Sequence, residues 1–497
     1  MTKQKDLKRR IRERMCKTGE SYTTARLYTL RRRPDDDCAA AAVSASTRTT
    51  DTPPDTPVRV RLPRINVATV PPSRLAYAVP VYTILLFIIL ALAGCDGESS
   101  GSGVAVRDSA GVRIVENLPR SVEAAQTWAV SEDPAVAIGG GVNPAASLYH
   151  ITDVAPLGRG RVAVGMNTPP QVLVFDEHGT LTATLGRRGE GPGEFTSVSS
   201  VVPLPGDSVA VWDADRRRIS IFGTSGRFVR DLDVSDVAPL SARAAPSTTF
   251  ASGFTHLLGS GPQAFVIFGE GALEPNAAPG IGRPTLPSIR ITTTGEVLAE
   301  FGSIPGMEMV RGGPAGAVPL PFGARTDAAT SGELLVVGTG ERTQFSVFGA
   351  DGALTRIVRW PSVDRMVGGD WLAEWMDMVE AAPPPIRELV EATPRSERFP
   401  AYDGLITSDE GNIAVGEYAG PTGIWPLRRA DEGPEALRPL RRTRERRWLV
   451  FNPDGVLTAM LATPEGFAPA AIRDGQIWGV FTDTLDIESV RAYRILR

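Results

Sequence analysis

Hydrophobic and polar positions form short alternating runs along most of this chain, most clearly between Leu185 and Leu232. That stretch holds four runs rich in Val, Ile or Phe, each bounded by Gly, Pro, Asp or Ser. The runs are Val198–Leu204, Ser208–Trp212, Arg218–Phe222 and Phe228–Leu232. Short β-branched and aromatic runs between turn residues predict an antiparallel four-stranded meander. Because such a unit cannot bury both faces alone, it needs neighbours of its own kind.

A hairpin of the same type recurs along the chain. Its copies are Val172–Leu185, Ile219–Leu232, Ile289–Phe301, Phe345–Val358 and Trp448–Leu461. The turns are closed by Gly179, Gly226, Gly295, Gly352 and Gly455. Glycine suits this place because it reaches positive φ without a Cβ clash. The spacing of these glycines fits a repeat of about 45–50 residues interrupted by insertions.

A further copy of the repeat is divided between the two ends of the folded part. Ala470–Ile472, Gln476–Phe481 and Ser489–Ile495 supply three strands, and no fourth strand follows them. Near the start, PAVAIGGG (Pro134–Gly141) is similar to ATLGRRGEG, which ends the first full unit. We therefore expect the early strand to complete the last unit and close a ring. Closure removes the sheet edges that promote aggregation.

These features resemble the six-bladed β-propellers of the NHL/TolB-like group, especially bacterial lipoproteins of that type. The resemblance rests on DSAGVRIVEN (Asp108–Asn117), GEGPGEF (Gly189–Phe195) and the V-x-x-F-x-x-x-G hairpins, and it covers about residues 104–497. It implies an all-β, six-bladed propeller with N- and C-terminal strand closure. It implies little about function, because propellers serve as lyases, lactonases, receptors and scaffolds.

The first 74 residues predict a disordered arm. A dense basic run, KQKDLKRRIRERMCK, is followed by RRRPDDD and the Ser/Thr/Pro-rich STRTTDTPPDTP. Low hydrophobicity and high charge do not offset the entropy of ordering. One interpretation is a cytoplasmic basic arm that contacts acidic lipid or nucleic acid. The other is a solvated tail or a start codon assigned too far upstream, because export signals normally begin at the N-terminus.

Residues 75–95, LAYAVPVYTILLFIILALAGC, are uncharged and end in a sequence that resembles a lipobox, Leu92-Ala93-Gly94-Cys95. In bacterial lipoproteins the cysteine of this motif is acylated. The resemblance therefore implies lipidation at Cys95, followed by a flexible tether over 96–103. The alternative is an uncleaved signal-anchor helix, for which the apolar length suffices. Either reading predicts a membrane-anchored protein of the cell envelope with its propeller on the extracytoplasmic side.

Charge and composition limit the classes of partner and cofactor that are expected for this chain. Residues 1–95 hold 17 Lys and Arg against 8 Asp and Glu, which leaves 36 against 49 in the remainder. The acidic folded part argues against nucleic acid as a partner. No cysteine follows Cys95, and the only histidines are His150, His178 and His256. We therefore expect no disulfide, no zinc site and no cofactor, although a calcium ion held by oxygen ligands in the channel stays an open alternative.

Two motifs admit both a chemical and a structural interpretation. Gly189-Glu190-Gly191-Pro192-Gly193 is glycine-rich, but it lacks the Lys-Ser/Thr and helix of a phosphate loop, so an interblade connector is expected. Asp213 and Arg217, within WDADRRR, could face the channel as a polar site. The alternative is a turn in which Asp213 and Asp215 accept backbone hydrogen bonds.

Four insertions interrupt the repeat: Gly269–Pro287, Gly302–Phe322, Pro361–Pro400 and Gly420–Glu445. Two lie between second and third strands and two join successive units, so in a propeller all four lie on one face. Long loops gathered on one side of a rigid scaffold usually carry binding. Within 361–400, Trp371, Leu372, Trp375, Met376 and Val379 form one apolar stripe of a helix ending near Glu380, and a second helix spans Pro385–Ala392.

The sequence therefore predicts a surface-tethered lipoprotein that binds a protein or small-molecule ligand through its loop-rich face. The expected contacts are Asp213, Arg217, Tyr402, Glu417, Trp425, Arg428 and Arg429. The last two belong to an arginine cluster that either pairs with the acids of the two helices or captures an anionic ligand. Its other members are Arg438, Arg441, Arg442, Arg444, Arg446 and Arg447. The alternative function is a lactonase-like hydrolase or lyase at the channel mouth. No nucleophile elbow or other catalytic motif decides between binding and catalysis.

The lipobox generates a direct prediction. Cys95→Ala should abolish acylation and leave an uncleaved precursor, because the thiol is the acceptor of the lipid. Palmitate labelling and electrophoretic mobility measure both effects. Labelling and mobility that match the wild type would exclude lipidation at Cys95.

Overall fold

A computed structural model describes residues 103–497 except 141–147, 224, 238–239, 241–255, 270, 272–278, 303, 314–315, 381, 383, 419–443 and 486. These residues belong to one compact unit, Gly101–Arg497. The predicted arm, the apolar segment and Cys95 lie outside the described residues.

The described chain forms six four-stranded antiparallel units, here called blades 1 to 6. Blade 1 contains β5 (Ile151–Pro156), β6 (Val162–Asn167), β7 (Pro170–Phe175) and β8 (Leu181–Leu185); blade 2 contains β9 (Ser200–Leu204), β10 (Ser208–Asp213), β11 (Arg218–Phe222) and β12 (Phe228–Asp233); blade 3 contains β13 (His256–Gly259), β14 (Ala264–Phe268), β17 (Ser288–Thr292) and β18 (Val297–Glu300). Blade 4 contains β22 (Asp327–Ser331), β23 (Leu334–Gly338), β24 (Gln344–Phe348) and β25 (Leu354–Arg359); blade 5 contains β26 (Gly404–Thr407), β27 (Ile413–Gly416), β28 (Arg446–Phe451) and β29 (Leu457–Thr463); blade 6 contains β30 (Phe467–Arg473), β31 (Gln476–Thr482), β32 (Glu488–Leu496) and β4 (Val136–Gly139). A 3₁₀ turn, Pro205–Asp207, joins β9 to β10.

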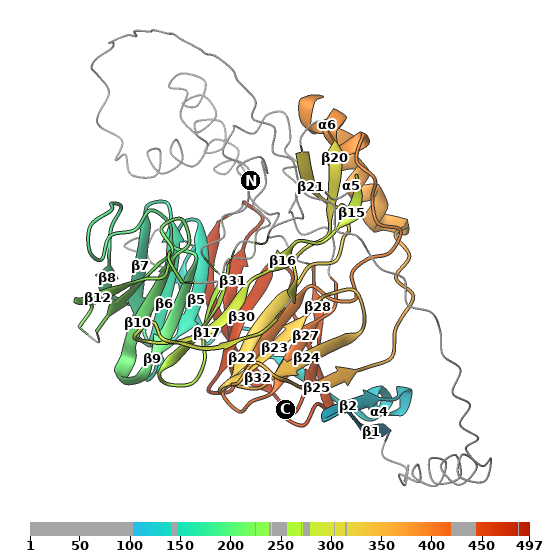
Figure 1. The fold of residues 1–497 in the computed structure, drawn as a ribbon, viewed down its shortest axis with the longest axis horizontal. Helices are drawn as coiled ribbons and strands as arrows, with labels where there is room; N and C mark the ends of the chain where they lie inside the picture. Colours follow the sequence, from blue (N-terminus) through green and yellow to red (C-terminus); the bar gives the residue numbers. More distant parts are fainter. Residues whose placement is uncertain are drawn as a thin grey trace, which may run out of the picture. The chain divides into compact units, whose positions relative to one another are not determined.

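The first strands of the blades form a closed ring. Each contacts the first strand of the next blade in the order β5, β9, β13, β22, β26 and β30, and β30 returns to β5. Figure 1 shows the join, where the red strands β30 and β31 lie beside the cyan β5. This is the architecture of a β-propeller.

The hydrophobic core is divided among the interfaces between blades. Six clusters of buried side chains each span two neighbouring blades, and together they cover every interface of the ring. Strand β10 shows how alternation produces this. Val209 and Val211 pack toward blade 1, whereas Ala210 and Trp212 pack toward blade 3. Because successive side chains point to opposite faces, one strand contributes to two interfaces.

The hairpin glycines predicted from the sequence occupy the turns between third and fourth strands. Gly179, Gly226, Gly295, Gly352 and Gly455 have φ between 75° and 98°. A side chain at Gly226 would also collide with Ala183 of blade 1, in the outer strand β8. Glycine is needed there because the turn has positive φ and lies against the preceding blade.

Blade 6 is completed by the N-terminal strand, as the sequence predicts. β4 pairs antiparallel with β32, from Val136 opposite Ala492 to Gly139 opposite Ser489. The contact begins earlier in the chain than expected. In β3 (Gln126–Val130), Ala129 and Val130 also pair with the end of β32, while Gln126 to Trp128 run parallel to β29 of blade 5.

Residues 104–124 form no part of the ring, and the sequence did not predict their position. Strands β1 (Val104–Ser109) and β2 (Val112–Asn117) form a hairpin whose second strand runs parallel to β25, and helix α4 (Pro119–Ala124) follows. Asn117, only 3% exposed, donates to the carbonyls of Arg359 and Gly455 and accepts from the Leu457 amide. The N-terminal segment therefore joins the outer edges of blades 4 and 5 before it closes blade 6.

Ring closure can be tested by deleting residues 131–141. The deletion should leave β32 with an unpaired edge and expose the core around Ile138, so the protein should aggregate. Light scattering and the apparent Tm measure the outcome. A monomeric deletion variant with an unchanged Tm would show that closure is made elsewhere.

Candidate functional site

Three of the four predicted insertions converge on one accessory structure, and the fourth lies almost entirely outside the described residues. β15 (Gly280–Gly282) of the first insertion pairs with β20 (Met309–Gly313) of the second, which pairs with β21 (Gly316–Pro319). β16 (Thr285–Leu286) pairs with β19 (Ile304–Pro305). The third insertion forms α5 (Gly369–Glu380) and α6 (Pro384–Glu391), close to the predicted helices. Figure 1 shows both helices beside this small sheet.

An aromatic cluster holds the accessory structure together. The ring of Phe322 lies 5.3 Å from the rings of both Trp375 and Phe399. Phe399 stacks on Tyr418, which directly precedes the fourth insertion, with centroids 5.2 Å apart. Of the predicted stripe on α5, Trp375 and Val379 are buried, whereas Met376 is 47% exposed. The stripe therefore packs largely inward, against the other elements of the accessory structure.

Charged residues occupy blades 4 and 5 at the points where the chain returns from the insertions. Arg446, at the start of β28, forms a buried ion pair with Asp403. It also donates to the carbonyls of Gly416 and Glu417, both at 3.0 Å. A Cβ on Gly416 would meet this guanidinium, so glycine makes room for it. Because every strong contact of Arg446 is internal, its charge is used to fix the blade.

Arg325 and Asp327 lie beside this ion pair. Arg325 donates to the carbonyl of Asp403 at 2.9 Å, and its Nε has no hydrogen-bond partner. Asp327 begins β22 opposite Gly338. Its Oδ2 is the one carboxylate oxygen among the described residues that is buried without a hydrogen-bond donor. Both residues have intermediate exposure, although these two atoms are buried.

The environment of Asp327 favours its protonated form. The pKa of Asp327 is raised to about 6. Desolvation is the largest cause and Asp403 adds to it, whereas Arg325 and Arg446 act in the opposite direction. Burial also raises the pKa of Tyr418, which lies near Asp403 and Arg325. A carboxyl group whose pKa is perturbed by burial and by specific charged partners is a feature of functional sites.

A second polar pair lies on the inner strands of blades 1 and 3. Burial lowers the pKa of His256, which begins β13, and the nearby Asp153 opposes this effect. Both oxygens of Asp153 accept backbone amides, from Val154 and Val201, at 2.8 Å. This carboxylate therefore ties β5 to β9.

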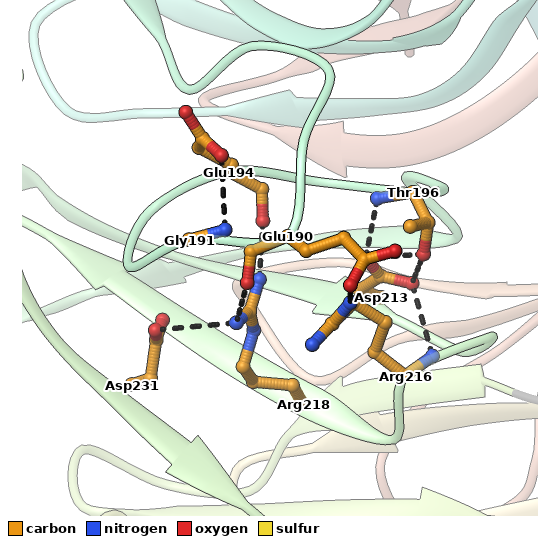
Figure 2. Close-up of polar contacts among 8 residues, drawn as sticks. All are labelled: Glu190, Gly191, Glu194, Thr196, Asp213, Arg216, Arg218 and Asp231. Atoms are coloured by element: carbon orange, nitrogen blue, oxygen red, sulfur yellow. Dashed lines mark hydrogen bonds and ion pairs between the residues drawn. The ribbon is translucent and has the colours of Figure 1, made fainter.

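Asp213 has a structural role in the connector between blades 1 and 2. It is fully buried and accepts hydrogen bonds from the amide of Thr196 at 2.7 Å and from the amide of Arg216 at 3.2 Å. The hydroxyls of Thr196 and Ser197 donate to the same carboxylate at 3.0 Å. Figure 2 shows Asp213 enclosed by Thr196 and Arg216. The turn interpretation of this aspartate is confirmed.

The glycine-rich stretch is likewise a connector. Arg218 donates to the carbonyls of Glu190 and Glu194 and lies 3.6 Å from Asp231 (Figure 2). The carboxylate of Glu194 accepts the Gly191 amide at 2.9 Å, and this bond together with Arg187 lowers the pKa of Glu194. These contacts confirm the interblade interpretation.

The other residues that the sequence predicts as ligand contacts lie in different parts of the propeller. Tyr402 is 1% exposed, and its hydroxyl donates to the Gln344 carbonyl at 2.6 Å. Glu417 accepts two hydrogen bonds from Arg447, at 2.8 and 2.6 Å. Arg217 has φ of 51° and donates to the Leu240 carbonyl at 2.8 Å. The structure therefore does not bring Asp213, Arg217, Tyr402 and Glu417 into one pocket.

Trp425, Arg428 and Arg429 lie outside the described residues. Of the predicted arginine cluster, Arg444 lies over the ring of Trp371 at 3.8 Å, while Arg446 and Arg447 pair with acids. Sequence reasoning missed Arg325, Asp327 and Asp403. The signal available for Asp327 and Asp403 was their place in the chain, since each follows an insertion and stands at or next to the start of an inner strand.

In the described part of the chain, no three His, Cys, Asp or Glu side chains are grouped so that they could hold a metal ion. None of its helices has the length and apolar character needed to cross a membrane.

No protein-family model matches the chain, and no curated protein matches its sequence. Solved structures with similar architecture include a candidate exported protein of Bacteroides fragilis (10% identity, TM-score 0.42, covering 74% of this chain and 98% of that one). A DUF4221 family member from Bacteroides vulgatus has 12% identity and a TM-score of 0.44, with coverage of 75% and 99%. Virginiamycin B lyase from Staphylococcus aureus has 11% identity and a TM-score of 0.32, with coverage of 69% and 94%. At these sequence identities and TM-scores, the fold of this chain is established by its own strand pairing and not by its similarity to the solved structures.

The raised pKa of Asp327 predicts a pH-dependent effect on stability. Its folded-state pKa of about 6 exceeds the ordinary value of 3.8. Proton binding by Asp327 therefore favours the folded state, and this contribution to stability is complete below pH 3.8 and is lost as pH rises through 6. Asp327→Asn should therefore raise the free energy of unfolding above pH 7 by about 1 kcal/mol, because partial solvent access reduces the full effect of the shift.

Denaturant unfolding at pH 4 and pH 8 measures this difference, which should vanish at pH 4. Asp454→Asn is the matched control, because the side chain of Asp454 is 66% exposed. An Asp327→Asn variant with equal stability changes at both pH values would show that the carboxyl group is ionised normally.

Proposed function

We propose that this protein is a cell-envelope lipoprotein, anchored through Cys95, whose propeller binds a ligand through the loop-rich face. The observation that carries the proposal is the convergence of the insertions. Strands from two of them pair with one another, and an aromatic cluster joins them to the third insertion and to Tyr418. A rigid ring with long loops on one face and short hairpins on the other is suited to binding.

The anchoring supports this role. An acylated Cys95, followed by the polar tether 96–103, would keep the propeller close to the membrane while leaving it free to reorient. If the apolar segment is retained as a signal-anchor helix, the propeller still lies on the extracytoplasmic side. The partner is a protein or a small molecule and, given the acidic folded part, not nucleic acid.

A second candidate function is hydrolysis or elimination at the channel mouth. Asp327 favours it, because a carboxyl group with a pKa of about 6 can both take and release a proton near neutral pH. His256, whose pKa is lowered by burial, would be a neutral base on another inner strand. Binding remains the leading proposal, because the convergence of the three described insertions supports it directly.

Site-specific photo-cross-linking in the full-length, membrane-anchored protein tests the proposal. A photoreactive residue at Met376, exposed on α5, should form adducts with an envelope component. The same residue at His178, exposed in a hairpin turn of blade 1, should form none. Arg428→Ala combined with Arg429→Ala should reduce the Met376 adduct, and an alanine at His178 should not. Adducts from His178 alone would place the binding face on the opposite side.

A further inference from the structure

Four charged side chains beside β22 and β26 form a cluster in which positive and negative charges are equal in number. Two guanidiniums, Arg325 and Arg446, face two carboxyl groups, Asp327 and Asp403. The buried phenol of Tyr402 also lies close to Asp327, and Arg283, which donates to Thr326 and pairs with Glu341, acts on the same phenol. An anion bound here would be repelled by both carboxyl groups, and a cation would be repelled by both guanidiniums. An uncharged ligand would experience neither repulsion, and the charges of the cluster already compensate one another.

The hydrogen-bonding capacity of the cluster is used unequally. Arg446 and Asp403 bind one another, and Arg446 also donates to two backbone carbonyls. Asp327 Oδ2 accepts no hydrogen bond, and Arg325 Nε donates none. A buried carboxylate oxygen left without a donor is costly, so a partner that is not part of the protein is expected there. That partner must offer a donor to Asp327 and can offer an acceptor to Arg325.

The neighbouring surface is aromatic. Tyr418 lies near Arg325 and Asp403 and stacks on Phe399, and both rings keep intermediate exposure. An aromatic face beside a small number of polar groups suits a ligand that carries both C–H and O–H surfaces. Hydroxyl groups supply the donor and the acceptor together, because each has one O–H bond and two lone pairs.

We propose that Asp327 and Arg325 bind a hydroxyl group of an uncharged, saccharide-like ligand, with Tyr418 against the carbon face of that ligand. This inference rests on the proposed binding function of the loop-rich face and specifies its ligand class. The hydroxyl donates to Asp327 and accepts from Arg325. The pKa of Asp327, near 6, supports a ligand contact that strengthens as the carboxyl group ionises.

Isothermal titration calorimetry on the full chain in detergent micelles tests the assignment. The probes are N-acetylglucosamine and maltose as uncharged saccharides, inorganic phosphate as an anion and putrescine as a cation. A saccharide should bind and the charged probes should not. Binding should weaken between pH 7.5 and pH 5, because protonation of Asp327 removes the better acceptor.

Asp327→Asn should weaken saccharide binding at pH 7.5 by about tenfold or more, the loss expected for a hydrogen bond to a charged group. The variant should also lose the pH dependence, which a purely structural role would leave in place. Asp454→Asn, a remote and exposed carboxyl group, should behave like the wild type.

The outcomes separate this inference from the proposed function. If Met376 cross-links a component but neither saccharide binds, or if phosphate or putrescine binds instead, the loop-rich face is a binding face and the ligand class is wrong. Saccharide binding that is equal in Asp327→Asn and wild type would remove Asp327 from the site. Saccharide binding that depends on Asp327, in a protein that forms no Met376 adduct, would support the ligand site at Asp327. It would also show that the accessory structure around Met376 does not contact the envelope component.

Discussion

The structure depends on the burial of apolar side chains between neighbouring blades. No blade has a core of its own, because its two faces contribute to two different interfaces, as Val211 and Trp212 of β10 show. Hydrophobic burial is proportional to the area removed from water, so a blade gains most of its stability only when both neighbours are present. A linear array would leave two apolar faces exposed, and the ring removes both.

This constraint explains the path of the N-terminal segment. The strand that completes blade 6 must come from the other end of the chain, since β32 is the last strand. On its way, the segment adds β2 to blade 4 and β3 to blades 5 and 6. Asn117 fixes this path through three buried hydrogen bonds that reach the end of β25 and the hairpin of blade 5. The closure therefore extends over three consecutive blades.

Two buried arginines show how a polar group with a structural role differs from one that is available to a ligand. Arg218 and Arg446 stand at the start of the third strands of blades 2 and 5, and both bind carbonyls and a carboxylate of their own blade or its connector. Their charges are thus satisfied inside the protein. Asp327 differs, because its buried oxygen receives no donor and its pKa is raised. Among the carboxylates of the described residues, Asp327 is therefore the one with a buried oxygen whose hydrogen-bonding capacity is unused.

The sequence by itself determined the repeat, the hairpin glycines, the closing strand and the common location of the three described insertions, because these follow from local alternation and turn chemistry. The strands of blade 2 begin and end within two residues of the prediction. Only the tertiary structure decided which polar residues meet. Asp213 and Tyr402 looked accessible from their neighbours in sequence but are buried and hydrogen-bonded within the propeller. Arg325, Asp327, Asp403 and Arg446 come together from separate strands and connectors of blades 4 and 5, and no local pattern encodes that meeting, because it depends on how two blades pack.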